Sequence, residues 1–203
     1  MLLRSLASAV LLATSWSAYA TDYPLQLQNC NYTVTLDKAP SSVVTIGQAG
    51  TEMLYALGLG DKVAGTALWF NPVQPRFKAI NDKVPRLSEN IPSFESVIGK
   101  RPALLVSQFE WMVGKDGVVG TREQFHDLHI ATYAMPADCE GKNNLVGSDG
   151  TRTASYDVKA LYKGIRQLAQ VFDVEARGEN LVKDLSERQT KAVAKVKSSK
   201  LNN

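Results

Sequence analysis

The sequence has few of the residues that small disulfide scaffolds and metal enzymes depend on. Its 203 residues include only two cysteines and two histidines, 21% are charged, and 44% are hydrophobic. Two cysteines are too few for a disulfide-dense scaffold, and these fractions are ordinary for a globular protein, which excludes a disordered or collagen-like chain. The formal net charge of +3 gives no electrostatic reason to expect a nucleic-acid partner.

The sequence also lacks the motifs of common enzyme classes. It has no Walker A loop, no G-x-S-x-G elbow and no H-E-x-x-H zinc motif. The glycine-rich residues 58–65 close a predicted helix instead of opening one, so we interpret them as a helix end and not as a dinucleotide fingerprint. His126 and His129 lie on one predicted helix, but a tight zinc site needs three or four ligands. We therefore predict no metal site, no cofactor and no catalytic residue.

The amino terminus is typical of a secretory signal peptide. Residues 1–20 combine an early positive charge, Arg4, with a short apolar run and a final Ala-Tyr-Ala. The run is too short to span a bilayer, and no later stretch approaches the roughly twenty apolar residues of a transmembrane helix. The residue directly after the cleavage site is Thr21, so the new amino terminus has no cysteine that would carry a lipid. These features predict export to a bacterial periplasm without a lipid anchor.

The two cysteines, Cys30 and Cys139, both lie in polar, turn-like segments. An oxidising compartment permits one disulfide between them. Closing such a long loop stabilises a fold by about 4 to 5 kcal/mol in the chain-entropy model. The alternative is two unpaired buried thiols, and the polar surroundings favour the disulfide.

Strand and helix signals alternate along most of the chain. Period-two alternation predicts an edge hairpin strand at 31–36. Short apolar runs predict buried strands at 43–46, 62–67, 102–106 and 130–134. Helices are expected between them, capped by Thr51, Ser93 and Thr121. This order predicts an α/β fold with a doubly wound, mostly parallel sheet.

The last part of the chain has a different pattern. Residues 141–154 are polar and are expected to form a loop. Residues 155–172 repeat apolar side chains at intervals of three and four, which predicts a long amphipathic helix. A second helix is expected at about 175–197, with an apolar stripe that no following element covers.

The loops that follow the predicted strands contain aromatic, amide and hydroxyl side chains. In a doubly wound sheet, the loops at the carboxyl ends of the strands line the ligand crevice. Aromatic rings with a few polar groups suit a bulky, partly apolar ligand better than a bare ion. The candidate ligand-binding residues are Gln48, Trp69, Phe70, Ser107, Gln108 and Trp111, with the ring of Phe109 in the same loop. The alternative for any single ring is that it packs in the hydrophobic core at the end of the sheet and does not contact a ligand.

Two motifs, each made of two segments, carry a resemblance to a known family. VVTI at 43–46 and TEMLYALGLGDKVAG at 51–65 resemble the opening of the periplasmic binding proteins of ABC importers for iron-siderophore complexes, haem and vitamin B12. PSFESVI at 92–98 and KRPALLV at 100–106 resemble a later helix–strand pair of that family, although Ala103 stands where members often carry Asp. The resemblance covers about residues 30–200.

The resemblance implies the class III, helical-backbone architecture, in which two α/β lobes are joined by a long helix. It divides the chain into a signal peptide at 1–20, an N-terminal α/β ligand-binding lobe at 21–154, an inter-lobe linking helix at 155–173, and the first helix of an incomplete second lobe at 174–203. We therefore expect a protein truncated after the first lobe and linking helix, which binds ligand weakly or not at all. A natural one-lobed form is the alternative.

The function that the resemblance implies is solute binding without catalysis. We expect a monomer that captures a ferric siderophore or a similar chelate, haem and cobalamin included, and that touches the membrane only through the importer's permease. The resemblance also implies that Glu95 docks into arginine pockets of the permease. The alternative for Glu95 is to stabilise the start of its own helix. The alternative function is a secreted α/β enzyme with its site in the same crevice.

Overall fold

The centre of the molecule is a five-stranded parallel sheet in the order β5-β4-β3-β6-β7. The computed structural model describes residues 20–145 and 150–201, so the predicted signal peptide, apart from Ala20, lies outside the described residues. The strands are β3 (Val43–Ile46), β4 (Val63–Ala67), β5 (Arg86–Ser88), β6 (Leu104–Ser107) and β7 (Ala131–Ala134). The chain runs from β3 outward to β5 and then returns to β6 on the other side, so the predicted doubly wound order is confirmed.

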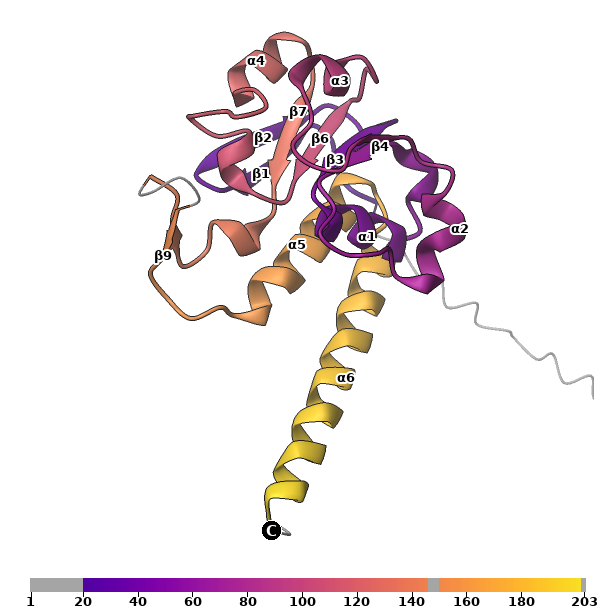
Figure 1. The fold of residues 1–203 in the computed structure, drawn as a ribbon, viewed down its shortest axis with the longest axis vertical. Helices are drawn as coiled ribbons and strands as arrows, with labels where there is room; N and C mark the ends of the chain where they lie inside the picture. The colour runs from indigo at the N-terminus through magenta and orange to yellow at the C-terminus, as the bar shows by residue number, and fades with distance from the viewer. Residues whose placement is uncertain (1–19, 146–149, 202–203) are drawn as a thin grey trace, which may run out of the picture.

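Helices cover both faces of this sheet (Figure 1). They are α1 (Gln48–Ala56), α2 (Lys78–Asn81), α3 (Phe94–Ile98), α4 (Arg122–Asp127), α5 (Val158–Val171) and α6 (Glu175–Leu201). Val43 belongs to a cluster with α1 and α5, and its neighbour Val44 belongs to a cluster with α3 and α4. Because both faces are covered, all residues of β3 and β6 are buried, which explains their continuous apolar runs.

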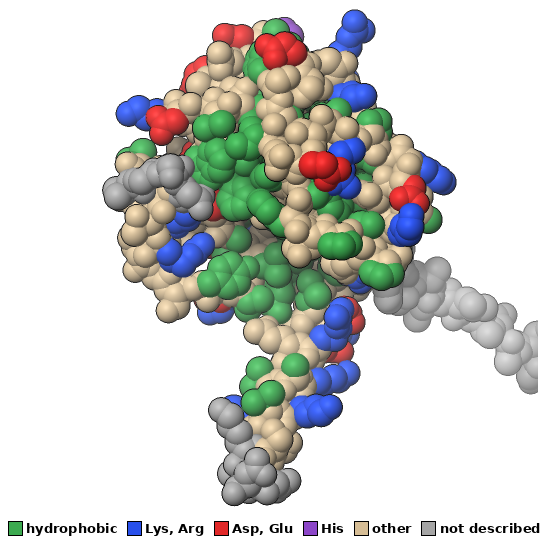
Figure 2. All heavy atoms as spheres, in the orientation of Figure 1, with side chains coloured by type: hydrophobic (Ala, Val, Ile, Leu, Met, Phe, Trp, Pro, Cys, Tyr) green, Lys and Arg blue, Asp and Glu red, His purple; other side chains and the backbone are tan. Residues whose placement is uncertain are grey.

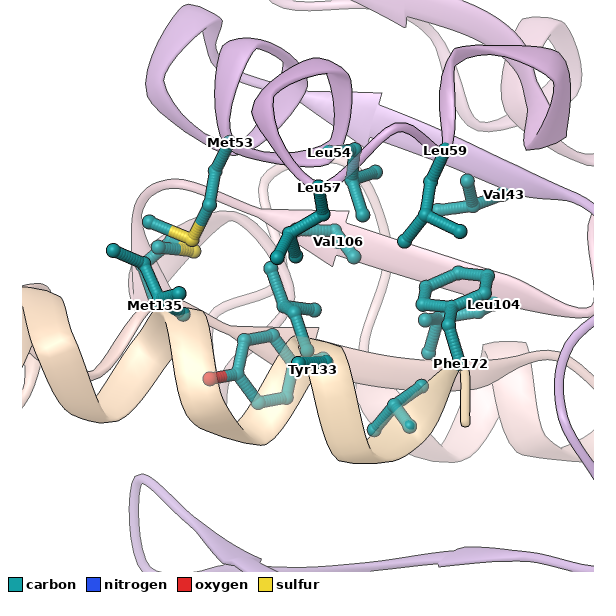
Figure 3. Close-up of a cluster of buried hydrophobic side chains, with 14 of the residues drawn as sticks. Val43, Met53, Leu54, Leu57, Leu59, Leu104, Val106, Tyr133, Met135 and Phe172 are labelled. Carbon is teal, nitrogen blue, oxygen red and sulfur yellow. The ribbon is translucent and has the colours of Figure 1, made fainter. Parts of the chain in front are cut away.

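The core between α1, the sheet and α5 contains large side chains in close contact (Figure 3). Leu54 of α1 and Leu57, the C-cap of that helix, are buried, and such burial stabilises a fold by about 1.5–3 kcal/mol per side chain. Tyr133 of β7 is also fully buried, and its hydroxyl donates a hydrogen bond to Gln167 Oε1 of α5 at 2.9 Å. Burial raises the pKa of Tyr133. The hydroxyl therefore stays a donor that joins α5 to the sheet.

The start of α1 differs from the sequence prediction. The predicted N-cap was Thr51, but the helix begins at Gln48 with Gly47 before it, and Thr51 is completely buried. The physical reason is that Thr45 and Thr66 bring hydroxyls into the core, where they need partners. The Thr51 hydroxyl lies 2.7 Å from that of Thr45 and 2.8 Å from that of Thr66.

The caps of the next two helices agree with the prediction. The side chain of Ser93 accepts a hydrogen bond from the backbone of Ser96 in α3, and Thr121 forms a capping box with Gln124 in α4. The sequence did not predict the strand at Leu25–Asn29, β5, α2 or a short antiparallel ladder within the expected loop at 141–154. The ladder pairs β8 (Lys142–Asn143) with β9 (Thr151–Arg152).

An antiparallel hairpin precedes the parallel sheet. β1 (Leu25–Asn29) pairs with β2 (Tyr32–Leu36), so the edge strand predicted at 31–36 is present. The hairpin packs beside β7 through Asn29, whose side chain donates to Ala134 O at 2.7 Å and accepts from Ala134 N at 2.8 Å. In the turn of the hairpin, Cys30 forms a disulfide with Cys139, with a Cα–Cα distance of 5.4 Å.

The two C-terminal helices have different surroundings. α5 packs on the lobe along one face, whereas α6 starts against α5 and then projects away from the lobe (Figure 1). Residues 186–199 of α6 are exposed throughout. The sequence predicts the linking role for residues 155–173, whereas the helix that projects from the lobe in the structure is α6, so which of the two helices joins a second lobe stays a prediction. In the described part of the chain, no helix has the length and apolarity needed to cross a membrane.

Candidate functional site

The six candidate ligand-binding residues all come from the carboxyl ends of three adjacent strands. Ile46, the last residue of β3, pairs with Ala67 at the end of β4 and with Ser107 at the end of β6. The loops that follow these strands therefore begin side by side at one edge of the sheet. This is the edge at which doubly wound folds bind their ligands.

Three aromatic rings form a row at this edge. The ring of Phe109 lies between those of Phe70 and Trp111, with centroid distances of 6.2 Å to Phe70, edge-on, and 6.1 Å to Trp111, stacked. Phe70 is 61% exposed, and the other two side chains are partly exposed. Figure 2 shows hydrophobic side chains gathered on the face of the lobe turned toward the viewer. The row offers an apolar, π-rich surface to a ligand.

Trp111 also carries a polar atom without a protein partner. Its indole Nε1 is buried, and within residues 20–145 and 150–201 it has no hydrogen-bond acceptor. A buried donor that makes no hydrogen bond costs about 1–3 kcal/mol. Such groups in a folded protein call for an explanation, and one explanation is an acceptor that comes from outside the chain.

Trp69 is held from two sides. Its indole Nε1 donates to Thr66 Oγ1 at 3.0 Å, and the Arg86 guanidinium lies 4.1 Å from the ring centroid. Arg86 also donates to Glu89 Oε2 at 3.2 Å. A shallow pocket of about 350 Å³ opens beside Trp69, lined by residues 69–73 with Arg86 and Glu89. The buried Thr66 hydroxyl thus fixes the orientation of the Trp69 ring, which borders the pocket.

The two glutamines tie neighbouring loops together. Gln108 Oε1 accepts from Ala49 N at 3.0 Å, and Gln48 Oε1 accepts from Asn71 N at 3.1 Å. Gly47 allows this close approach, because a Cβ at that position would lie 2.2 Å from the Gln108 Cβ. The amide groups therefore shape the rim of the site, and ligand contact by them stays a prediction.

Ser107 lies beneath the rim instead of on it. The residue is fully buried, and its hydroxyl donates to Phe109 O at 2.8 Å. Because Ser107 is the last residue of a central strand, helices cover it on both faces of the sheet. It supports the loop that carries Phe109 and Trp111 and does not reach the surface that a ligand would contact.

Sequence reasoning missed the buried charges that anchor this loop. The Glu110 backbone N–H donates to Asp138 Oδ2 at 2.7 Å, while Asp138 Oδ1 pairs with Lys142 Nζ at 2.5 Å. Burial raises the pKa of the Glu110 carboxyl, and the nearby Arg122 opposes that shift. Asp138 precedes Cys139, so the disulfide and the ion pair fix the same segment. The signal in the sequence that could have indicated this ion pair is the four-residue spacing of Asp138 and Lys142.

Glu95 is exposed in the first turn of α3. In the part of the chain that the structure describes, its carboxylate is in no ion pair. Glu123 occupies the same position in α4, where backbone hydrogen bonding lowers the pKa of its carboxyl. Glu95 is thus available to a partner, while the helix start alone also accounts for a carboxylate at this position.

The remaining polar clusters lie away from this edge. A cavity of about 290 Å³ between β2 and α4 is lined in part by Lys38, Arg122, His126 and His129. Arg122 is buried and donates to Thr132 O at 3.2 Å, and burial lowers its pKa. Both histidines are exposed, and the described residues contain no cluster of three or more His, Cys, Asp or Glu side chains that could hold a metal ion.

Comparisons with known proteins agree with this geometry. Residues 43–202 match the model of a family described as "Periplasmic binding protein". The "Uncharacterized ABC transporter substrate-binding lipoprotein YvrC" of Bacillus subtilis (strain 168) is 26% identical over 175 residues, which is 84% of this chain and 48% of that protein.

Two solved structures share the fold. A periplasmic binding protein from Veillonella parvula has a TM-score of 0.64 at 23% identity, covering 83% of this chain and 52% of that one. A structure described as an ABC-type Fe3+-hydroxamate transport system from Saccharomonospora viridis has a TM-score of 0.64 at 25% identity. The match covers 82% of this chain and 55% of that one. The chain spans about half the length of these relatives.

Proposed function

Because this chain belongs to the periplasmic binding protein family, we propose that it is the solute-binding component of an ABC importer. In this proposal it is a monomer, exported by a signal peptide at 1–20, that captures a ferric siderophore or a related metal chelate, haem and cobalamin included. It then delivers the chelate to the membrane permease. It acts by binding alone, since the family consists of substrate-binding transport proteins.

The observation that carries this proposal is the row of Phe70, Phe109 and Trp111 at the carboxyl edge of the sheet. A bulky chelate with an apolar face packs on such rings, and a few polar groups beside them set its orientation. The description of the relative from Saccharomonospora viridis as an Fe3+-hydroxamate transport system supports the ligand class.

We propose that residues 21–154 form one lobe of the binding protein. α6 then leads from this lobe toward a second one, because α5 is packed on the sheet while α6 extends into solvent with Val193 and Val196 exposed. The chelate in this arrangement lies between the two lobes. Contacts from the first lobe alone give weaker binding than contacts from both.

Tryptophan fluorescence tests the ligand proposal directly, because Trp69 and Trp111 are the only tryptophans after residue 20. The probes are ferrichrome, ferric enterobactin, haemin and cyanocobalamin. Because contacts from the first lobe alone give weak binding in this proposal, we expect at least one of them to quench the emission only at high concentration and to change the melting temperature of the chain little. Phe70→Ala removes an exposed ring and is expected to weaken the binding about tenfold, which corresponds to roughly 1.4 kcal/mol.

The matched control is Leu128→Ala, which shortens an exposed side chain beside the amino ends of β6 and β7. It is expected to leave the affinity unchanged. If none of the four probes changes the fluorescence or the melting temperature, the proposal of chelate capture is wrong. Chemical conversion of a probe would instead favour the alternative, a secreted α/β enzyme.

Docking to the permease is tested with a matched pair of glutamates. Glu95→Gln and Glu123→Gln each remove one carboxylate from the first turn of a capped helix, so their effects on helix stability are similar. We expect Glu95→Gln to weaken association with the permease in proteoliposomes several-fold, with a loss that shrinks at high salt. An equal effect of both substitutions would contradict a specific docking role for Glu95.

A further inference from the structure

The first residue after the predicted cleavage site contacts one turn of the protein through its backbone nitrogen and its hydroxyl. The backbone nitrogen of Thr21 donates to Asp173 Oδ1 at 2.7 Å. Its hydroxyl is within hydrogen-bond reach of Gln170 O, at 2.9 Å, and of Glu175 Oε1. These partners lie at the end of α5, between the helices and at the start of α6. Thr21 thus contacts the junction from which α6 leaves the lobe.

The junction carries two carboxylates and, among the described residues, no Lys or Arg in an ion pair with either of them. Asp173 has a φ of +55°, and its backbone N–H donates to Gln170 O at 3.1 Å, so its backbone belongs to the turn that ends α5. The charges of Asp173 and Glu175 both raise the pKa of the Tyr23 hydroxyl, although burial of that hydroxyl is the larger cause. The surroundings of Thr21 N are therefore negative, which suits a cation better than an amide.

We propose that cleavage after Ala20 creates this cation, and that the new α-ammonium group of Thr21 forms an ion pair with Asp173 that fixes the α5–α6 junction. A signal peptidase hydrolyses the peptide bond between Ala20 and Thr21: water adds across the C–N bond, Ala20 leaves as a carboxylate, and Thr21 N takes up protons to become the α-ammonium. The ammonium nitrogen occupies the position from which the amide already donates to Asp173.

The ion pair links processing to the position of α6. The segment that begins with Thr21 continues directly into β1, and the Tyr23 hydroxyl donates to Val171 O at 3.0 Å. The mature amino terminus is thus attached to the hairpin on one side and to the helix junction on the other. This inference rests on the proposed export of the chain but not on its ligand. The ion pair can therefore be absent while chelate binding holds, and chelate binding can be absent while the ion pair forms.

Two versions of the full chain after the leader test the proposal, one beginning at Thr21 and one beginning at Ala20. The extra alanine moves the positive charge away from Asp173 and leaves an amide at Thr21. We expect the chain that begins at Thr21 to melt about 1–4 °C higher than the chain that begins at Ala20. This is the shift expected in a domain of this size from a single ion pair that is exposed or half-buried. The Asp173→Asn substitution should abolish that difference between the two versions.

Asp22→Asn is the matched control, since it removes the same charge from an exposed neighbour and should preserve the difference. Mass spectrometry of the exported protein is expected to find Thr21 as its first residue. The inference is wrong if the exported chain begins elsewhere, if both versions melt at the same temperature, or if Asp173→Asn leaves their difference intact.

Discussion

α5 and α6 follow each other in the chain and both have an apolar stripe, yet only α5 is covered along its whole length. Ile165 and Leu168 of α5 are buried against the sheet. In α6, Val182 is buried near the start, while Val193 and Val196 are 47% and 54% exposed. The comparison shows that an amphipathic pattern marks the side of a helix that is able to bury apolar surface, whereas the neighbouring elements decide whether that side is covered.

The contacts between the two helices change along α6 in the same way. Near its start, Arg166 of α5 donates to both Glu179 carboxylate oxygens, at 2.7 and 3.1 Å. Farther along, the Tyr162 hydroxyl donates to Gln189 at 3.0 Å. Beyond that residue, the described part of α6 makes no hydrogen bond to another element. The stability of the fold should therefore depend on α5 and the start of α6.

The largest expected effect comes from a cavity in the covered helix. Leu168→Ala should lower the free energy of unfolding by about 2–5 kcal/mol, because Leu168 is fully buried and the surrounding core relaxes only partly. Val193→Ala removes an exposed side chain of α6 and should change the free energy of unfolding by no more than about 0.5 kcal/mol. Urea unfolding monitored by circular dichroism measures both values.

Similar losses for both variants would contradict the comparison, because they would mean that the exposed half of α6 is covered in solution. A change in the oligomeric state of Val193→Ala, measured by analytical ultracentrifugation, would identify a second copy of the chain as that cover. The expected result is a monomer in both cases.

The next largest effect concerns buried hydroxyls within the lobe. Thr51→Val preserves the shape of the side chain but removes the hydroxyl that contacts Thr45 and Thr66. We expect unfolding to require about 1–3 kcal/mol less, since the remaining hydroxyls lose a partner in the core. Thr51→Ser keeps the hydroxyl and is the control for that loss. Equal stability of the Thr51→Val and Thr51→Ser variants would contradict this role of the buried hydroxyl.

The smallest effect is expected at the exposed ion pair between the helices. The hydrogen bonds from Arg166 lower the pKa of Glu179, so the pair stabilises the fold above the ordinary glutamate pKa and loses this contribution as the pH falls through the lowered value. Glu179→Gln should therefore reduce stability at pH 7 by at most about 1 kcal/mol and match the unsubstituted chain near pH 3. Glu187→Gln, an exposed change elsewhere on α6, should have no effect at either pH.

Much of the fold could be predicted because its signals are local. The four apolar runs became β3, β4, β6 and β7, and the caps at Ser93 and Thr121 start the helices that follow them. β5 escaped prediction because its three residues, Arg86–Ser88, are only half-buried at the edge of the sheet and show no apolar run. An edge strand is recognised mainly through its pairing with β4, which is not local.

The candidate site could be predicted in place but not in detail. The rule about strand ends brought Phe70 and Trp111 to the same edge, where Phe109 joins their rings. It did not show that Ser107 is buried or that Asp138 holds the loop from below, because both facts depend on segments far apart in the sequence. Ligand contact by the candidate residues stays a prediction that the fluorescence titration tests.

The sequence by itself determined four of the five central strands, most of the helices, the mostly parallel character of the sheet and the family, because apolar periodicity, capping residues and contiguous motifs are properties of neighbouring residues. Only the tertiary structure decided that Thr51 lies in the core, that α6 and not α5 leaves the lobe, and that Thr21 meets Asp173 at 2.7 Å. These outcomes depend on which surfaces are left to cover once the sheet has formed. That competition for burial and for hydrogen-bond partners is settled between residues distant in the chain.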